Sequence, residues 1–180
     1  GLIIVGSMPL MIFGYILHSS DLIHFVRNVE IIAWTTLFFG LILYFSDQSK
    51  TEKNMSKNLN LKSIIFIGIF QILALIPGVS RAGITITAAR FLNYNRVDST
   101  KISFLLSIPA LIGASSLGIT DALKETLEIS YLSIIAIILS FLFSFITVKY
   151  FLKYVNNFSL NIFVIYRVFL GIILLLIIYL

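Results

Sequence analysis

The sequence predicts an all-α integral membrane protein, a helical bundle of about five transmembrane helices plus one re-entrant helical hairpin. Of its 180 residues, 59% are hydrophobic and 12% are charged, and the mean hydropathy is +1.04. Soluble domains carry about 25% charged residues, so that class is excluded. The apolar runs are continuous, whereas strands of a membrane barrel alternate apolar and polar residues, so we expect helices. Residues 1–180 are expected to form a single membrane domain.

Five apolar runs are long enough to cross a bilayer. Each contains 16 to 19 residues, close to the ~20 residues that a helix needs to span the hydrocarbon core. The five runs are Leu2–Leu17, Ile31–Ser46, Ser103–Thr120, Tyr131–Val148 and Ile162–Leu180. The chain contains no cysteine, which excludes disulfides and thiol chemistry.

The segment 63–92, between the second and third spans, is interrupted. Its first apolar run, Ser63–Ile76, would measure roughly 21 Å as a helix, less than a hydrocarbon core of ~30 Å. Its second run, Ile84–Leu92, is shorter still, and Pro77 and Gly78 stand between the two. This pattern predicts a re-entrant hairpin that turns at Pro77 and Gly78 in the outer half of the membrane. A hairpin of two full spans is the alternative.

The basic residues gather in three of the five connections. Nine of the thirteen Lys and Arg lie there: Lys50, Lys53, Lys57, Lys62, Arg90, Arg96, Lys101, Lys149 and Lys153. Cytoplasmic loops carry the excess of Lys and Arg, so these connections are predicted to be cytoplasmic. The N-terminus is then inside and the C-terminus outside, provided that segment 63–92 enters and leaves on one side. The net charge of +5 reflects this topology and does not indicate nucleic acid.

The turn residues combine the features of an anion site. Pro77 and Gly78 end one helix, because proline disfavours helix before it and glycine relaxes the turn. Ser80 is placed to cap the next helix, whose free N–H groups and positive dipole end suit a phosphate. Arg81 adds a planar fork of donors that fits phosphate oxygens, and Thr85 shares its helix face. The sequence therefore predicts an anion site inside the membrane that faces a cavity.

Polar residues within apolar segments need a partner or a task. A structural Arg81, paired with a carbonyl or a carboxylate elsewhere in the bundle, is the alternative to an anion site. Arg167 lies about one turn inside the last span, and we expect it to snorkel to the cytoplasmic side, with a functional pairing as the alternative. Gln71 is expected to hydrogen-bond within the bundle. His18 and His24 do not share a helix face, so we expect a solvated loop there instead of a metal site.

The run Gln71-Ile-Leu-Ala-Leu-Ile-Pro-Gly-Val-Ser-Arg-Ala-Gly-Ile-Thr closely resembles the Pro-Gly-x-Ser-Arg-Ser-x-x-Thr motif of the bacterial undecaprenyl-diphosphatases, the bacitracin-resistance family. Downstream, Ser103-Phe-Leu-Leu-Ser-Ile-Pro-Ala-Leu-Ile-Gly-Ala is similar to the next helix of that family, and Tyr166-Arg167 resembles a pair in its last helix. The resemblance covers nearly the whole chain.

The resemblance implies a hydrolase that converts undecaprenyl diphosphate to undecaprenyl phosphate and phosphate. Such a phosphatase recycles the lipid carrier of peptidoglycan synthesis, which links it to cell wall biogenesis, cell shape and bacitracin resistance. By the resemblance, Ser80, Arg81 and Thr85 are catalytic, and Gly78, Ser80 and Arg81 bind the substrate, with Arg81 at the diphosphate. The expected location is the bacterial inner (plasma) membrane, as a multi-pass protein with the active site facing outside.

The chain departs from the family pattern in two respects. Ala82 stands where the family usually has Ser, which removes one hydroxyl contact. The family's N-terminal part, with a Glu-rich motif and a Ser/His re-entrant loop, is not covered, so we expect residues 1–180 to be the C-terminal part of a longer fold. All eight carboxylates lie in predicted loops or at span ends, and none is near Arg81 in sequence. The chain therefore has no assigned metal ligand. The resemblance implies that a divalent metal, Mg²⁺ or Ca²⁺, is held by the N-terminal part.

A second function fits the same residues. A lipid-phosphate transporter or flippase would use the same anion site without cleavage, since half-helix termini in re-entrant segments also mark transporters. Carboxylates close to Arg81 in space favour the enzyme, and a second access path to the cytoplasm favours transport. In both cases the partners are a polyprenyl diphosphate lipid and the membrane. A lipid phosphatase with a downstream His-x-x-x-Asp base is excluded, because no His follows Ser80.

Overall fold

The computed structural model describes residues 1–20, 28–124 and 131–180. In these ranges the regular secondary structure is helical, apart from one isolated bridge between Lys53 and Tyr94. The helices are α1 (Leu2–Ser19), α3 (Val29–Asp47), α4 (Met55–Asn58), α5 (Leu61–Ile72), the 3-10 turn η1 (Leu73–Leu75), α6 (Arg81–Phe91), α7 (Arg96–Lys124), α8 (Tyr131–Asn157) and α9 (Asn161–Tyr179). His24 and most of the connection after α7 lie outside the described residues.

Five helices in the described ranges are long and apolar enough to cross a membrane, namely α1, α3, α7, α8 and α9. This confirms the five predicted spans and a multi-pass membrane protein. Some helices extend beyond their apolar runs: α7 begins at Arg96, and α8 continues to Asn157. Hydropathy marks only the apolar part of a helix, whereas its end depends on capping. At α7 the Asn95 side chain accepts a hydrogen bond from the Asp98 N–H at 2.7 Å, which allows the helix to begin in polar sequence.

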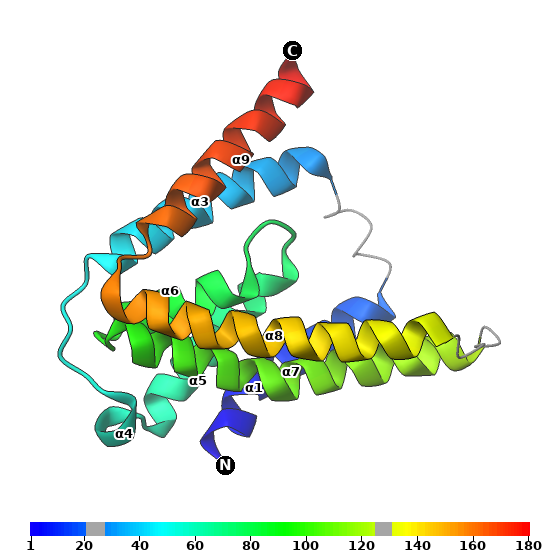
Figure 1. Cartoon of the computed structure of the whole chain (residues 1–180), viewed down its shortest axis with the longest axis horizontal. Helices are drawn as coiled ribbons and strands as arrows, with labels where there is room; N and C mark the ends of the chain where they lie inside the picture. Colours follow the sequence, from blue (N-terminus) through cyan, green and yellow to red (C-terminus); the bar gives the residue numbers. More distant parts are fainter. Residues whose placement is uncertain (21–27, 125–130) are drawn as a thin grey trace.

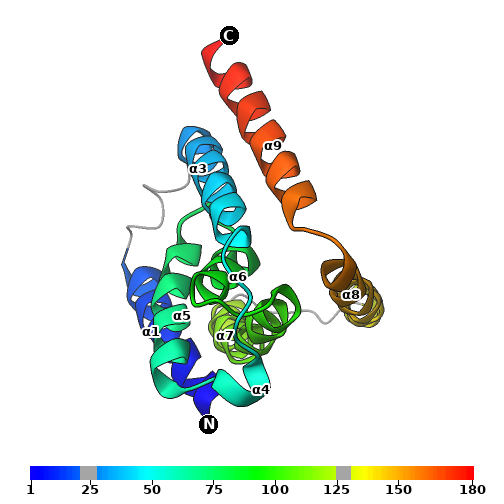
Figure 2. The same cartoon turned by 90° about the vertical axis from the view of Figure 1, so that its left-hand side faces the viewer.

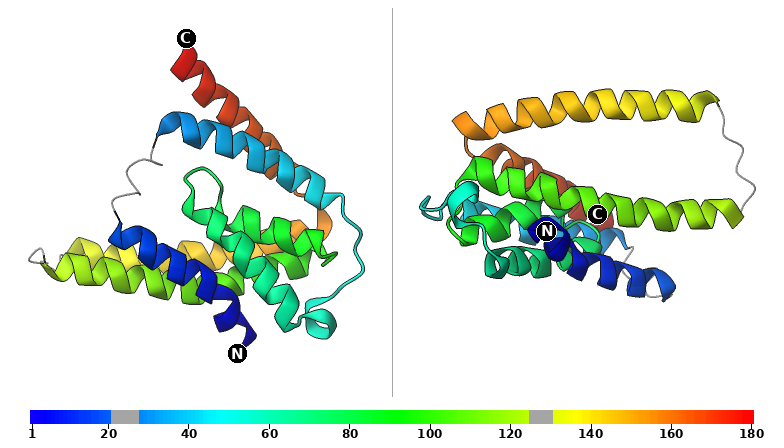
Figure 3. Two further views of the ribbon diagram at one scale, coloured as in Figure 1. Left: turned by 180° about the vertical axis from the view of Figure 1, so that it is seen from behind. Right: turned by 90° about the horizontal axis from the view of Figure 1, so that it is seen from below.

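The α5–α6 hairpin lies in the centre of the bundle. Helix α6 packs against α3 on one side and α7 on the other, and α5 packs against α1. Figure 2 shows this order, with α6 between α3 and α7. Helices α3 and α9 pack along each other above the hairpin (Figure 1). Helix α8 returns antiparallel to α7, as both views of Figure 3 show.

Two glycines bring α1 and α5 into direct contact. A Cβ atom on Gly68 would clash with the backbone carbonyl of Gly6, and one on Gly6 would lie 2.6 Å from Ile64 Cγ1. Beside this crossing the Ser7 hydroxyl donates to the Leu106 carbonyl of α7 at 3.2 Å. Small residues let membrane helices approach until their backbones touch, because van der Waals packing replaces the hydrophobic effect there. The crossing fixes the hairpin against α1.

The two ends of the hairpin lie together. The Tyr94 hydroxyl, just after α6, donates to the Asn58 carbonyl just before α5, at 2.8 Å. Helix α5 and η1 contain 12 and 3 residues and α6 contains 11. At 1.5 Å per residue these arms are about 22 Å and 16 Å long, shorter than a ~30 Å hydrocarbon core. The hairpin therefore starts and ends on one side of the bundle, as predicted, and its re-entry into the bilayer stays a prediction.

A buried ionic cluster closes the open end of the hairpin. Asp47, at the end of α3, receives two hydrogen bonds from Arg96, Nε to Oδ1 at 2.7 Å and Nη2 to Oδ2 at 2.9 Å. Arg90 Nε lies 3.7 Å from Asp47 Oδ1, and its Nη2 donates to the Asp47 and Ser49 carbonyls. The Leu160 N–H also donates to Asp47 Oδ2, at 3.2 Å. This Asp47 cluster (Asp47, Arg90 and Arg96) joins the ends of α3, α6, α7 and α9.

Candidate functional site

The turn between α5 and α6 contains two residues with positive φ, one glycine and one serine. After η1 the chain passes through Pro77 to Gly78, which has φ +89°, and then to Ser80, which has φ +67°. Glycine adopts such angles readily, whereas a residue with a side chain is strained there. Ser80 caps α6, because its Oγ accepts the Gly83 N–H at 3.3 Å. The predicted helix stop and the predicted cap are both confirmed.

Helix α3 holds this turn from outside the hairpin. The Thr35 hydroxyl donates to the Pro77 carbonyl at 2.6 Å, and the Thr36 hydroxyl donates to the Gly78 carbonyl at 3.3 Å. The contact is close enough that a Cβ on Gly78 would lie 2.6 Å from the Ile32 carbonyl oxygen and would clash with Thr35 Oγ1. Gly78 is therefore required both for its backbone angle and for the space that it leaves to α3.

Arg81, the first residue of α6, lines a cavity of about 600 Å³ that we call the α1 cavity. Its other walls come from α1, from the end of the first hairpin arm and from α7, and include Tyr15, Leu75, Ala110 and Ser116. The Nη1 atom of Arg81 is buried and has no hydrogen-bond partner within the described ranges. A guanidinium nitrogen without a partner retains its capacity to donate, at the position where an anion was predicted to bind.

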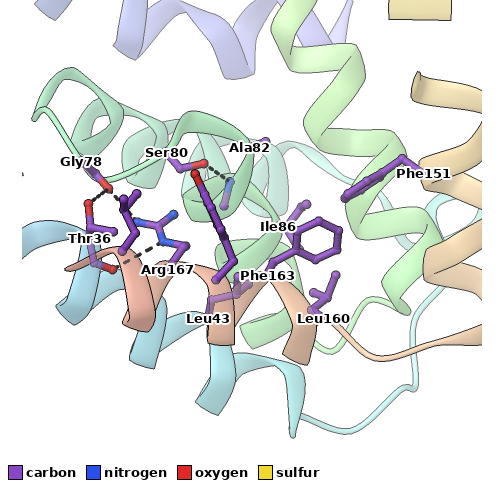
Figure 4. Close-up of a pocket in the computed structure, with 13 residues that line it drawn as sticks. Thr36, Leu43, Gly78, Ser80, Ala82, Ile86, Phe151, Leu160, Phe163 and Arg167 are labelled. Carbon is purple, nitrogen blue, oxygen red and sulfur yellow. Dashed lines mark hydrogen bonds between the residues drawn. The ribbon is translucent and has the colours of Figure 1, made fainter. Parts of the chain in front are cut away.

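Ser80 and Gly78 line a different cavity, of about 470 Å³, which we call the α9 cavity. Arg167 of α9 is at its polar end, where Nη2 donates to the Gly78 carbonyl at 2.7 Å and Nε donates to the Thr36 carbonyl at 3.5 Å. Figure 4 shows these contacts, with Phe163, Leu160 and Ile86 farther along the cavity. The turn thus separates two cavities, each with one arginine at the turn.

Thr85 lies away from both cavities. It is buried on the α7 side of α6, where its Oγ1 lies 2.6 Å from the Ser103 hydroxyl and also donates to the Arg81 carbonyl at 2.9 Å. Thr85 and Arg81 both face α7, as the helix spacing predicted. The structure therefore brings Gly78, Ser80 and Arg81 to the turn and places Thr85 in the packing behind it.

Two expectations about polar residues in apolar segments were wrong. Arg167 does not snorkel to the cytoplasmic side: only 7% of it is exposed, and it points inward because the carbonyls of Thr36 and Gly78 are within reach. Gln71 is fully buried, and neither of its side-chain amide atoms has a partner among the described residues. Residue spacing gave no signal for the Arg167 contacts, since the residues that it joins are 89 and 131 positions away.

Within the described residues, no three His, Asp or Glu side chains come together in a way that would hold a metal ion. No carboxylate of those residues lies within 4 Å of either Arg81 or Arg167. His18 lies in the last turn of α1 and lines the α1 cavity with Arg81. The described part of the chain therefore has cationic hydrogen-bond donors at the turn, and its His, Asp and Glu side chains form no metal cluster.

Comparison with known proteins identifies relatives over almost the whole chain. The family model of the bacitracin resistance protein BacA matches residues 1–173. A protein of Pelagibacter ubique (strain HTCC1062) named undecaprenyl-diphosphatase is 60% identical over 179 residues, which cover 99% of this chain and 70% of that protein. Proteins of the same name from Jannaschia sp. (strain CCS1) and Ruegeria sp. (strain TM1040) are each 38% identical, over 99% and 98% of this chain and 67% of their own length.

Proposed function

We propose that this chain, which belongs to the bacitracin resistance protein BacA family, acts in the hydrolysis of undecaprenyl diphosphate to undecaprenyl phosphate and phosphate. The observation that carries the proposal is the turn at Gly78 and Ser80, where α6 starts and the unpaired Nη1 of Arg81 faces the adjoining α1 cavity inside the helical bundle. The relatives named undecaprenyl-diphosphatase support the same activity. The reaction would make the protein a part of the recycling of the cell-wall lipid carrier.

The chemistry requires positive charge at the turn. Water attacks the terminal phosphorus, the bond from that phosphorus to the bridging oxygen breaks, and undecaprenyl phosphate leaves with the electron pair. Negative charge on the phosphoryl oxygens must be stabilised, and preorganised donors in a site without bulk water do this most effectively. Arg81 supplies a charged fork of donors for these oxygens. The Ser80 hydroxyl and the start of α6 add further dipoles, oriented by the cap to Gly83.

Thr85 has a different proposed task. Its hydroxyl joins α6 to Ser103 of α7, so it fixes the direction in which Arg81 leaves the helix. A catalytic donor must be held to within a fraction of an ångström, because small displacements weaken transition-state contacts. We therefore assign Thr85 as a positioning residue and Gly78, Ser80 and Arg81 as the residues that face the substrate.

A group that activates water is also needed. The described residues place no carboxylate within 4 Å of Arg81, and they do not fit a divalent metal. The chain spans 70% of the Pelagibacter ubique relative. We propose that the general base, and the ligands of a divalent cation such as Mg²⁺ or Ca²⁺, come from the part of the family fold that these 180 residues do not cover.

The direct test measures phosphate release from undecaprenyl diphosphate by purified protein in detergent, with and without Mg²⁺ or Ca²⁺. We expect turnover when the chain is joined to the remainder of the Pelagibacter ubique relative, and we expect no turnover by the 180-residue chain alone. Metal-dependent turnover by the short chain, abolished by Arg81→Ala, would contradict our placement of the water-activating groups. Joined protein that binds the lipid without releasing phosphate would refute hydrolysis.

The orientation of the site is also a proposal. We place the turn toward the outer face of the bacterial plasma membrane, because the connections rich in Lys and Arg are predicted to be cytoplasmic. The chain has no cysteine, so a single introduced cysteine reports on one loop. A membrane-impermeant maleimide should label Glu125→Cys from outside intact cells and should spare Lys53→Cys. The reverse labelling pattern would invert the topology and place the turn toward the cytoplasm.

Transport of a lipid phosphate through the same site is the second candidate. The two separate cavities on either side of the turn favour it, since an anion held at the turn would have apolar space on both sides. Proteoliposomes distinguish the two functions. Hydrolysis releases phosphate without moving lipid between leaflets, whereas transport moves a fluorescent polyprenyl phosphate between leaflets without releasing phosphate.

A further inference from the structure

Arg167 carries a buried positive charge that no described carboxylate neutralises. Its partners are the backbone carbonyls of Gly78 and Thr36, and the residue is only 7% exposed. No Asp or Glu of the described residues lies within 4 Å of it. Carbonyl dipoles satisfy N–H groups, but they do not cancel a full charge, and an uncompensated charge in a low-dielectric interior is costly. The site therefore favours the arrival of an anion.

The third nitrogen of this guanidinium faces the head of the α9 cavity. Nη1 makes no hydrogen bond to any residue that the structure describes, and Arg167 lines this cavity with Ser80 and Gly83. A Cβ placed on Gly83 would lie 3.0 Å from Arg167 Nη1 and 3.3 Å from Ser80 Oγ. Gly83 thus leaves a small space in which the arginine nitrogen and the serine hydroxyl approach the same point. A donor, a hydroxyl and the start of α6 meet there.

Apart from the phenol of Tyr166, the rest of the α9 cavity is apolar. Beyond its polar head the wall is formed by Leu43, Ile86, Phe151, Leu160, Phe163 and Leu170. Figure 4 shows Arg167, Gly78 and Ser80 at one end and the aromatic and aliphatic side chains at the other. A cavity with one cationic end and a long apolar wall matches an anion that carries a hydrocarbon tail.

We propose that Arg167 binds a phosphate oxygen of the lipid diphosphate, together with Ser80, at the head of the α9 cavity, with the first part of the lipid tail against the apolar wall. This rests on the proposed function and adds a second guanidinium to the turn, from α9. Nε and Nη2 of Arg167 keep their hydrogen bonds to the two carbonyls, while Nη1 donates to a phosphate oxygen. The geometry explains why Arg167 turns inward when a snorkelling path to water is the usual choice for arginine near a helix end.

A purely structural role for Arg167 is less consistent with its surroundings. The start of α6 has a positive dipole end, so a cation beside it experiences repulsion from the helix. The buried Arg90, by contrast, has the Asp47 carboxylate 3.7 Å from its Nε. An anionic ligand at the turn would supply the counter-charge that Arg167 lacks among the described residues.

The test measures ligand binding by calorimetry on the full purified chain in uncharged detergent, over a range of NaCl concentrations. The probes are inorganic pyrophosphate and farnesyl diphosphate, which share the anion and differ in the tail. We expect Arg167→Gln to weaken both probes at least tenfold and to reduce the salt dependence of binding. Lys153→Gln, an exposed cation on α8, is the matched control and should change binding less than twofold.

A second variant, Thr36→Val, distinguishes the charge of Arg167 from its effect on the position of the turn. It removes a hydrogen bond to the same Gly78 carbonyl without removing a charge. We expect it to weaken binding less than Arg167→Gln and to leave the salt dependence unchanged. Equal losses, with equal salt dependence, would mean that Arg167 only positions the turn. If Arg167→Gln does not fold, as judged by its melting temperature, Arg167→Lys replaces it and should weaken binding by an intermediate factor.

The outcomes separate this proposal from the proposed function. If Arg81→Gln loses binding while Arg167→Gln binds within twofold of the parent, the second guanidinium is refuted and the Arg81 site stands. If Arg81→Gln also binds within twofold, the Arg81 site itself fails. Tighter binding of farnesyl diphosphate than of pyrophosphate supports the tail in the α9 cavity. Equal affinity would refute the tail and leave a site for a free anion.

Discussion

At the open end of the α5–α6 hairpin, Arg90 and Arg96 share the buried carboxylate of Asp47. At the turn, Arg81 and Arg167 have no carboxylate within ion-pair distance in the described ranges. One chain therefore contains two pairs of arginines that differ in charge compensation. Arg90 and Arg96 share one carboxylate, whereas Arg81 and Arg167 have none among the described residues.

The presence or absence of a carboxylate partner distinguishes a structural arginine from a ligand-binding one inside a membrane bundle. One arginine of each pair, Arg90 or Arg167, donates to backbone carbonyls, so these bonds alone do not distinguish the pairs. The presence of Asp47 does, because a buried charge is stable only when an opposite charge or a ligand accompanies it. Changes at the Asp47 cluster should therefore alter stability first, and changes at the turn should alter binding and activity first.

The largest effect is expected for Asp47→Asn. This change keeps the shape of the side chain but leaves Arg90 and Arg96 without a counter-charge, and removing one partner of a buried pair costs about 3–5 kcal/mol. We expect a much lower melting temperature in detergent. Lys101→Gln, which removes the cation from the exposed pair with Asp98, is the control and should cost less than about 1 kcal/mol. Equal losses in the two variants would mean that the Asp47 cluster contributes no more to the free energy of unfolding than an exposed ion pair.

Arg81→Lys should lower activity strongly and change stability little, the reverse of what we expect for Asp47→Asn. Lysine keeps the charge and loses the bidentate fork, so kcat/KM of the joined enzyme is expected to fall by about a hundredfold, as for the loss of one preorganised donor. The melting temperature should stay within a few degrees of the parent, roughly what a change below 1 kcal/mol produces. Activity within twofold of the parent, or a large loss of stability, would mean that Arg81 has a structural role like that of Arg90 and Arg96.

Gly78→Ala tests the backbone that supports the turn. At φ +89° an alanine is strained, and its Cβ would press on Ile32 and Thr35 of α3. Residues held in such regions cost about 1–3 kcal/mol, and the displaced turn would also lose its contact with Arg167. We expect a lower melting temperature together with weaker pyrophosphate binding. Gly1→Ala is the control, since a Cβ there has no atom within 4 Å and Gly1 lines neither cavity, and it should leave both measurements close to the parent.

The comparison also separates what the sequence predicts from what it does not. Five spans, the stop at Pro77 and Gly78 and the Ser80 cap follow from local rules of length, backbone angle and capping, and they are confirmed. The inward direction of Arg167 depends on a carbonyl 89 residues away, which no local pattern contains. Asp47 was expected at the end of a span, but its burial between two arginines also depends on distant contacts. The sequence indicates the residue types of a site, whereas distant contacts in the fold determine which arginines have a carboxylate partner.

The smallest effect is expected behind the turn, at the contact between Thr85 and Ser103. The two hydroxyl oxygens lie 2.6 Å apart in the interface between α6 and α7, and a buried hydrogen bond of this kind contributes about 1 kcal/mol. Thr85→Val and Ser103→Ala should each lower the free energy of unfolding by about this amount. The double variant should lose less than the sum, because one interaction is removed only once. If Thr85 acts by positioning, Ser103→Ala should reduce kcat/KM by a factor similar to that of Thr85→Val. A much larger loss for Thr85→Val alone, with Thr85→Ser retaining activity, would show that its hydroxyl contacts the substrate. Thr85 would then join Gly78, Ser80 and Arg81 as a residue that faces the substrate.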